Sequence, residues 1–354
     1  SPSVSAAWRI SEETFMRRTR SWLDNLKFRL SYGTLGNQYT SSLYPYMATI
    51  EPTTSIMPIG GSITSAMRQN SASNRYITWE TIKMTNLGLD MGLFNNKLNM
   101  SFDYFIKDTD DILLRVELPG VLGVTEPYQN AGKVRNKGWE LALSWKDKIG
   151  KNFTYGVDFN LSDVKNEVVS MGNTADDFSG DQIRAVGYPI DAFWGFQADG
   201  LYTVDDFDYD VNTGKYTPKK STPVIEELRT KVQPGDIKYR DLDGDGEITT
   251  KDDRTYIGSA IPRYTYSLGV NAAWKGIDLK VFLQGVGKCD GYVGGMGRHA
   301  FTEVANYPQK VHLDRWTWDN QNSHATYPRF TYDETYNKKF SSFWIEDASY
   351  LRVK

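Results

Sequence analysis

Cysteine and histidine are scarce in this sequence. The 354 residues include one cysteine, Cys289, so neither an intramolecular disulfide framework nor a cysteine-based zinc site can form. The histidines, His299, His312 and His324, lie far apart without metal-ligand spacing, and we interpret them as solvated loop residues. Net charge is also small, at −3, which gives no reason to expect a nucleic acid as partner.

The sequence also lacks any long apolar run. No stretch of about 18 apolar residues is present, so we predict no transmembrane helix. A strand of a membrane barrel needs only about 9–11 residues, of which alternate ones are apolar. The mean hydropathy of −0.52 is therefore compatible with a barrel. Aromatic residues make up 14% of the chain and there are 30 glycines, a composition that favours an all-β fold.

Period-two alternation of apolar and polar residues runs through the chain, as in strands whose successive side chains face opposite ways. It occurs at residues 26–35, 86–93, 97–106, 139–146, 153–161, 264–274 and 277–284. The chain opens at Ser1 and stops at Lys354 inside similar patterns, so we expect a section of a longer polypeptide of about nine strands. Aromatic residues near strand ends, among them Trp139 and Trp274, suit the interfaces of a bilayer.

The connections between these segments alternate in length. Tight ones are predicted at about 94–96, 147–151 and 275–276, and long ones at about 36–84, 107–137, 162–262 and 287–342. Short periplasmic turns and long extracellular loops are typical of outer-membrane barrels, whereas such loops are unusual in a compact soluble domain. The polar face carries many charges, which favours a wide barrel with an aqueous lumen. The alternative is the solvated face of a soluble antiparallel sheet.

Residues 241–252, within the 162–262 loop, fit a twelve-residue calcium loop. Calcium takes six to eight oxygen ligands. The ligands predicted by position are the carboxylates of Asp241, Asp243, Asp245 and Asp252, the carbonyl of Glu247 and a water held by Thr249. Asp252 stands where a bidentate glutamate is usual, and the alternative is an Asp/Gly-rich turn that binds nothing. We predict a structural Ca²⁺ that staples the loop.

No catalytic constellation stands out, because the carboxylates are distributed along strands and loops without a defensible pair, and we predict that the protein is not an enzyme. Three loop tryptophans, Trp194, Trp316 and Trp318, are weak candidates for stacking on sugar rings or peptides. The alternative for each is ordinary packing within a loop.

Several motifs resemble, in order along the chain, those of SusC/RagA-type TonB-linked outer-membrane proteins. These motifs are Ser31-Tyr32-Gly33 with Gly36-Asn37-Gln38, Trp79-Glu80 with Thr85-Asn86-Leu87-Gly88-Leu89-Asp90, Asp103-Tyr104-Phe105, Asn130-Ala131-Gly132 with Asn136-Lys137-Gly138-Trp139-Glu140, Gly235-Asp236-Ile237-Lys238-Tyr239, and Ser349-Tyr350-Leu351-Arg352. They cover nearly the whole chain and match only the C-terminal part of the family's barrel. No counterpart of the family's plug or TonB box is found.

The resemblance implies a section of a twenty-two-stranded antiparallel transmembrane barrel in the bacterial outer membrane. It implies import of oligosaccharides, less often peptides, with a SusD-like surface lipoprotein and the TonB–ExbB–ExbD complex as partners, and places the calcium loop outside the cell. Two other classes stay open: a passive porin-like barrel, and a secreted all-β glycan-binding module, which would be soluble without detergent.

Overall fold

The computed structural model describes residues 1–39, 44, 46–48, 50–54, 65–69, 72–115, 121, 123–172, 174–295, 298–301, 307–332 and 335–354. In these ranges the regular structure is strand, with helix only as short 3-10 segments. None of the helices found in these ranges has the length and apolarity needed to cross a membrane.

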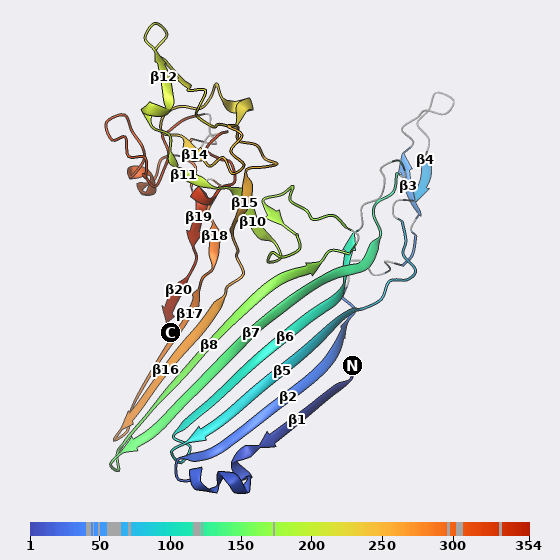
Figure 1. The fold of residues 1–354 in the computed structure, drawn as a ribbon, viewed down its shortest axis with the longest axis vertical. Coiled ribbons are helices and arrows are strands. Elements are labelled where there is room, and N and C mark those ends of the chain that lie inside the picture. Colours follow the sequence, from blue (N-terminus) through green and yellow to red (C-terminus); the bar gives the residue numbers. More distant parts are fainter. Residues whose placement is uncertain are drawn as a thin grey trace.

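One large antiparallel sheet dominates the molecule (Figure 1). Its nine strands lie side by side in chain order, and β1 and β20 form its two edges, so the sheet is not closed into a barrel. Its strands are β1 (Ser3–Arg9), β2 (Leu23–Asn37), β5 (Glu80–Leu93), β6 (Leu98–Arg115), β7 (Tyr128–Ile149), β8 (Phe153–Ser170), β16 (Tyr264–Trp274), β17 (Ile277–Gly287) and β20 (Tyr350–Val353). The prediction of about nine strands of an antiparallel transmembrane barrel is confirmed.

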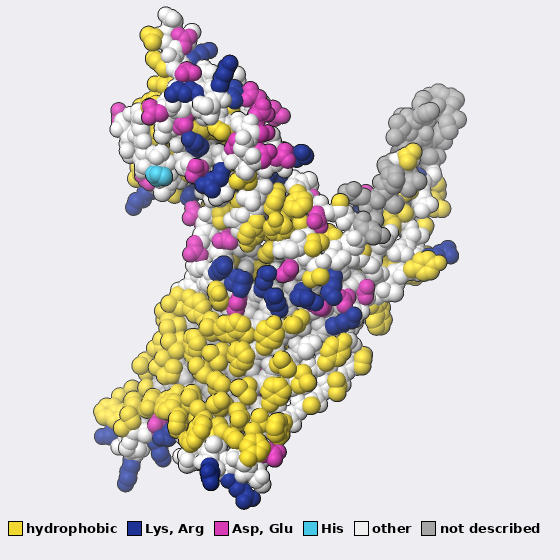
Figure 2. Space-filling model, viewed as in Figure 1, with side chains coloured by type: hydrophobic (Ala, Val, Ile, Leu, Met, Phe, Trp, Pro, Cys, Tyr) yellow, Lys and Arg dark blue, Asp and Glu magenta, His cyan; other side chains and the backbone are white. Residues whose placement is uncertain are grey.

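The register separates an apolar face from a polar face over the lower part of this sheet. One row across the strands is apolar: Phe28, Leu89, Phe102, Leu141, Leu161 and Tyr266. The next row on the other face is polar or small: Lys27, Asp90, Ser101, Ala142, Asn160, Ser267 and Gln284. Leu87 and Phe102 keep 40% and 37% of their surface exposed, so no second layer covers the apolar face. Figure 2 shows that face as a continuous apolar band.

Aromatic rows border the apolar band. At the upper border, Tyr104 of β6, Trp139 of β7 and Tyr264 of β16 lie in one row across the strands. At the lower border, near the tight turns, Phe153 of β8 pairs with Trp274 of β16. Ten residues separate Tyr264 from Trp274, which is about 34 Å along a strand and, at a tilt of about 40°, roughly 26 Å of height. That height matches the apolar band of an outer-membrane barrel, about 25 Å.

Tight turns join the strands at one end of the sheet. Left-handed backbone at Phe94, Asn95 and Asn96 reverses the chain between β5 and β6, and Lys275-Gly276 does so between β16 and β17. A moderate connection with η1 (Ile10–Glu12) and η2 (Thr14–Thr19) joins β1 to β2. The tight turns predicted at 94–96 and 275–276 are confirmed. The turn predicted at 147–151 is present but lies at residues 150–152, because β7 continues to Ile149 and β8 begins at Phe153.

Long connections meet at the opposite end. Each of the first three predicted long connections is too long. β6 continues to Arg115 and β7 begins at Tyr128, so most of 107–137 is strand, and β8 takes residues 162–170 from the predicted 162–262 loop. β2 likewise continues to Asn37 and β5 begins at Glu80, inside the predicted 36–84 connection. Cross-strand pairs such as Asp108 with Arg135 continue the ladder where apolar alternation stops. Part of the connection predicted over 36–84 lies outside the described residues.

Short strands and 3-10 segments fold the long connections. They are β3 (Ile50–Thr54), β4 (Ser65–Gln69), β9 (Gln182–Ile183), β10 (Ala192–Phe196), β11 (Ala198–Leu201), η4 (Val204–Asp206), β12 (Phe207–Asp210), β13 (Lys215–Pro218), η5 (Glu226–Leu228), β14 (Ile237–Tyr239), β15 (Arg254–Gly258), β18 (Asp290–Tyr292), η6 (Lys310–Leu313), η7 (Ser342–Trp344) and β19 (Ile345–Asp347). The main buried core lies here and not in the sheet. We call the described residues of 192–258 and 316–344, which supply this core, the loop domain. The interpretation of the histidines as solvated is wrong for His299 and His312, which are 4% and 2% exposed because they pack against the rings of Trp344 and Tyr327. His324 is exposed, as expected.

Candidate functional site

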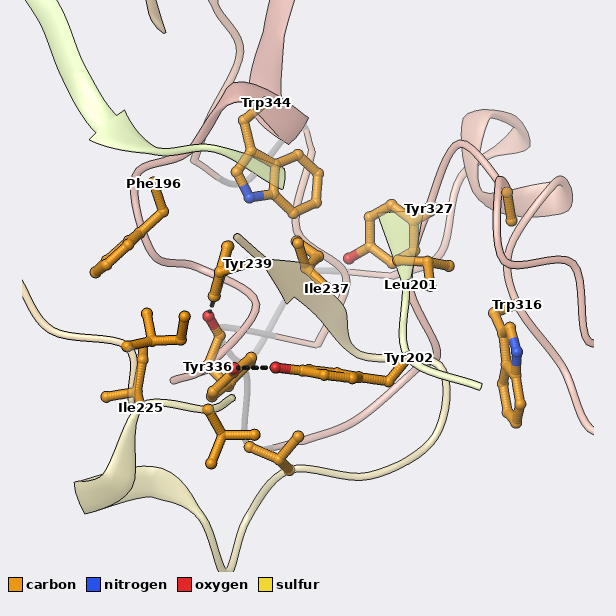
Figure 3. Packing of buried hydrophobic residues seen from close by; sticks show 14 of the residues in the cluster. Phe196, Leu201, Tyr202, Ile225, Ile237, Tyr239, Trp316, Tyr327, Tyr336 and Trp344 are labelled. Atoms are coloured by element: carbon orange, nitrogen blue, oxygen red, sulfur yellow. Dashed lines mark hydrogen bonds between the residues drawn. The ribbon is translucent and has the colours of Figure 1, made fainter. Parts of the chain in front are cut away.

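Three tyrosines organise the core of the loop domain. The hydroxyls of Tyr202 and Tyr336 lie 3.0 Å apart, and the Tyr239 hydroxyl donates to the Tyr336 carbonyl at 2.9 Å (Figure 3). Burial raises the pKa of Tyr202 and Tyr239 well above the ordinary value, so both remain neutral donors. Segments about 100 residues apart in sequence are thereby joined into one body at the end of the sheet.

A buried ion pair joins the same segments. Asp236 is 1% exposed; its carboxylate lies 2.7 Å from Arg329 Nε and accepts a hydrogen bond from Asn337 Nδ2 at 2.9 Å. Burial raises the pKa of Asp236, and the charge of Arg329 opposes that shift. Gly235, at φ +88°, precedes it with its α-carbon against the Trp316 ring, where a β-carbon would lie 2.4 Å from ring atoms. The predicted Gly235-Asp236 motif is therefore structural.

The acidic loop beside this core brings three carboxylates together. Single oxygens of Asp241, Asp243 and Asp253 lie within 4.8 Å of one another, close enough for one cation to contact all three. Two glycines with positive φ, Gly244 and Gly246, turn the chain, and both donate their N–H to Asp241. These hydrogen bonds, that from Gly246 first, lower the pKa of Asp241.

Asp253 organises the loop from below. It is 1% exposed, and its two carboxylate oxygens accept the N–H groups of Leu242 and Thr249, each at 2.7 Å. Ile248 is 2% exposed and anchors the loop to the core, and its N–H donates to the Val224 carbonyl. The twelve-residue spacing points to Asp252 and not to Asp253, although the adjacent aspartates at 252 and 253 are visible in the sequence.

The remaining predicted ligands lie outside the group of three. Asp245 accepts the N–H of Glu247 at 2.8 Å, and the Asp252 side chain is 44% exposed with Lys251 at 3.4 Å. The predicted twelfth ligand is thus one residue away from the carboxylate that the structure brings in. A turn causes this shift, because the Asp253 N–H bonds to the Thr249 carbonyl and carries the side chain inward.

Like charges crowd the loop. The hydrogen bond from Asp245 N–H lowers the pKa of Asp243, but partial desolvation and the charges of Asp245, Asp253 and Asp241 outweigh it, and the net pKa is raised. The repulsion would be relieved by a divalent cation. The donor set is all oxygen, which is the chemistry that Ca²⁺ prefers over softer metals.

The three candidate tryptophans lie in different environments. Trp316 is 2% exposed within the core, so the expectation that it could stack on a substrate is wrong. Trp194 packs against Phe178, with ring centroids 4.9 Å apart. Trp318 is 53% exposed and stacks on Tyr216 at 5.3 Å, and Tyr216 in turn meets Tyr209 at 4.7 Å. Trp318, Tyr216 and Tyr209 form a partly open row of rings that we call the aromatic row.

The polar face of the large sheet carries fixed charges. Arg29 donates to Asp90 through Nε and Nη2, each at 2.9 Å, and to Asp103 at 3.0 Å, while Ser101 links the two carboxylates. Because two carboxylates surround one guanidinium, this group carries a net charge of −1. Charges so held would face water or another polar surface inside a closed barrel.

Known proteins are similar to this chain along nearly its whole length. The family model described as TonB dependent receptor-like, beta-barrel, matches residues 1–353. TonB-dependent receptors P3 and P26 of Formosa agariphila are 29% and 30% identical over 365 and 367 residues, covering 100% of this chain and 34% of each relative. TonB-dependent receptor SusC of Bacteroides thetaiotaomicron is 29% identical over 213 residues, 55% of this chain and 21% of that protein. This chain thus spans about a third of the length of the curated relatives that it matches throughout.

Solved structures share the fold. The structure titled as the RagAB peptide transporter matches with a TM-score of 0.72 at 23% identity, covering 99% of this chain and 36% of that one. The RagAB peptide importer in the open-open state gives a TM-score of 0.74 at 23% identity, covering 99% and 35%.

Proposed function

Because the chain belongs to the TonB-dependent receptor β-barrel family, we propose that it works in energy-coupled import of nutrients across the outer membrane. The observation that carries the proposal is the single-layer sheet, whose one face is an uncovered apolar band and whose other face is polar and charged. A wall of this kind separates lipid from an aqueous lumen. In this proposal the energy for import comes from the inner membrane, and the chain itself catalyses no reaction.

The partners that we propose are a SusD-like surface lipoprotein on the extracellular side and the TonB–ExbB–ExbD complex on the periplasmic side. The likeness to SusC and to the RagAB structures supports this assignment. The loop domain supports it as well, since a packed core at the long-loop end gives a partner a rigid surface.

Oligosaccharides are the substrate class that we propose, with peptides as the second. The aromatic row favours sugars, because Trp318 and Tyr209 are each 53% exposed and offer ring faces on the extracellular side. Aromatic faces provide large apolar contact areas with polar edges. RagAB is a peptide transporter, and the likeness of this chain to it keeps peptides in the proposal.

Uptake in whole cells tests energy coupling. Cells that express the full-length protein are given labelled oligosaccharide and labelled peptide pools, with and without a functional TonB. The proposal expects accumulation of one pool that stops when TonB is removed. A passive porin-like barrel would continue to equilibrate the pool without TonB, and that result would refute energy coupling.

We propose further that the 241–253 loop holds a structural Ca²⁺. The convergence of Asp241, Asp243 and Asp253 and the raised pKa of Asp243 support it. Asp241, Asp243 and Asp253 would hold the ion, which would neutralise their repulsion and fasten the loop to Ile248. Equilibrium dialysis of the full-length protein against ⁴⁵Ca²⁺ tests this: one tightly held ion is expected, and no retained ion in the wild type would exclude the site.

A further inference from the structure

Charged side chains form a belt on the outer face of the sheet, directly above the apolar band. Figure 2 shows dark blue and magenta groups across the upper parts of β5 to β8 in that position. The belt consists of six basic residues, Lys83, Lys133, Arg135, Lys137, Lys165 and Arg263, and four acidic residues, Asp108, Asp110, Asp163 and Glu167. The belt therefore carries two positive charges in excess.

Each acid of the belt already has a basic partner. Asp108 lies 2.7 Å from Arg135, Asp110 lies 2.8 Å from Lys83, Asp163 lies 2.7 Å from Arg263, and Glu167 lies 2.9 Å from Lys165. Lys137 has no carboxylate within ion-pair distance in the described part of the chain. The positive charge of the belt is thus concentrated on β7, which carries Lys133, Arg135 and Lys137, whereas β8 contributes one base and two acids.

Two lysines face each other at that place. Lys137 on β7 is the direct cross-strand partner of Lys165 on β8, and both side chains are exposed. Like charges directly opposite in an antiparallel pair are destabilising. The row below contains Trp139 and Asp163, so the lysine pair stands one row above the aromatic border of the apolar band. Glu167 pairs with Lys165 at 2.9 Å, so the charge of this pair that no carboxylate of the described residues compensates at ion-pair distance is that of Lys137. A further anion beside Lys137 would offset the remaining repulsion.

We propose that the Lys137–Lys165 pair binds a phosphate group of a phosphorylated glycolipid in the outer leaflet, whose acyl chains lie against the apolar band. Two observations favour this occupant. The phosphate is negative where the belt is positive, and the lysine pair lies one row above the aromatic border of the apolar band. The neighbouring Arg135 and Arg263 supply further positive charge, and their partners Asp108 and Asp163 keep them oriented along the belt. The inference rests on the position of the sheet in the outer membrane and not on what the protein imports.

Native mass spectrometry of the full-length protein in mild detergent tests the pair. The protein is titrated with bisphosphorylated lipid A, with its dephosphorylated form and with inorganic phosphate. Each lysine near an anionic lipid surface contributes roughly fivefold in affinity. We therefore expect Lys137→Gln/Lys165→Gln to lower the affinity for the phosphorylated lipid roughly 25-fold, and to remove the preference over the dephosphorylated form.

Two controls separate charge from folding. Lys27→Gln/Lys280→Gln removes two lysines from the lumen face and should leave lipid binding unchanged. Lys137→Arg/Lys165→Arg keeps both charges and should retain binding. The proposal is overturned if the glutamine variant binds as the wild type does, or if the folded arginine variant loses binding. It is also overturned if inorganic phosphate alone displaces the lipid at matching concentration, since the site would then be one for free phosphate.

Discussion

Trp139 on β7 lies directly opposite Asp163 on β8, and this pair marks the height at which the outer face of the sheet stops being apolar. Below it the same face presents Leu141 opposite Leu161 and Leu143 opposite Phe159, and above it Lys137 opposite Lys165. One strand ladder therefore passes from a hydrocarbon-compatible surface to a water-compatible one within two rows.

Removing the guanidinium of Arg329 should loosen the loop domain strongly. Arg329→Met leaves the buried Asp236 carboxylate unpaired, and breaking such a pair costs about 3–5 kcal/mol. Limited proteolysis of the full-length protein should show rapid cleavage in the 192–258 segment. Arg240→Met is the matched control, because its pair with Asp199 is exposed and lies 3.5 Å apart. Equal protease resistance of the two variants would contradict the assignment.

The two adjacent aspartates should differ in their effect on the acidic loop. Asp253→Ala removes acceptors for the N–H groups of Leu242 and Thr249, so we expect ⁴⁵Ca²⁺ retention to fall at least tenfold and the loop to be cleaved faster. Asp252→Ala removes an exposed carboxylate and should have the smaller effect on both measurements. If Asp252→Ala had the larger effect on both measurements, the ligand would be Asp252, as the spacing in the sequence predicts.

Acid should weaken the packing around His299. This side chain is 4% exposed against Trp344, and burial lowers its pKa from 6.5 to about 4. The unfolded segment then binds a proton that the folded one excludes, so stability is complete above pH 6.5 and falls by up to about 3 kcal/mol as pH drops toward 4. Hydrogen exchange of the full-length protein between pH 7 and 4.5, with rates corrected for intrinsic pH dependence, measures the loss. His299→Gln should flatten that dependence, whereas the exposed His324→Gln should leave it unchanged.

The sheet was predictable from the sequence because its physics is local. A strand between lipid and water must alternate, so Leu87, Phe102, Leu141 and Val281 could be assigned to the apolar face without coordinates. Where alternation of apolarity ends, as at Asp108 and Arg135, the strands continue on cross-strand ion pairs, and the predicted boundaries were wrong there.

The loop domain was not predictable in the same way. Its core depends on contacts between distant segments, such as Tyr202 with Tyr336, for which the sequence carries no periodic signal. The burial of Trp316 and the inward turn of Asp253 are consequences of that packing. The acidic spacing located the loop correctly, but it could not choose between neighbouring aspartates at its end.

As the wall of a membrane barrel, the sheet must contact lipid with its outer, apolar face. Leu143 lies near the middle of the apolar band, and Ala142 beside it points to the polar face. Arginine in place of Leu143 should cost about 2–4 kcal/mol at the bilayer midplane and reduce the amount of heat-modifiable, folded full-length protein in the outer membrane. Ala142→Arg should assemble as the wild type does. If Leu143→Arg assembled normally and Ala142→Arg failed, the apolar face could not be the surface that contacts lipid.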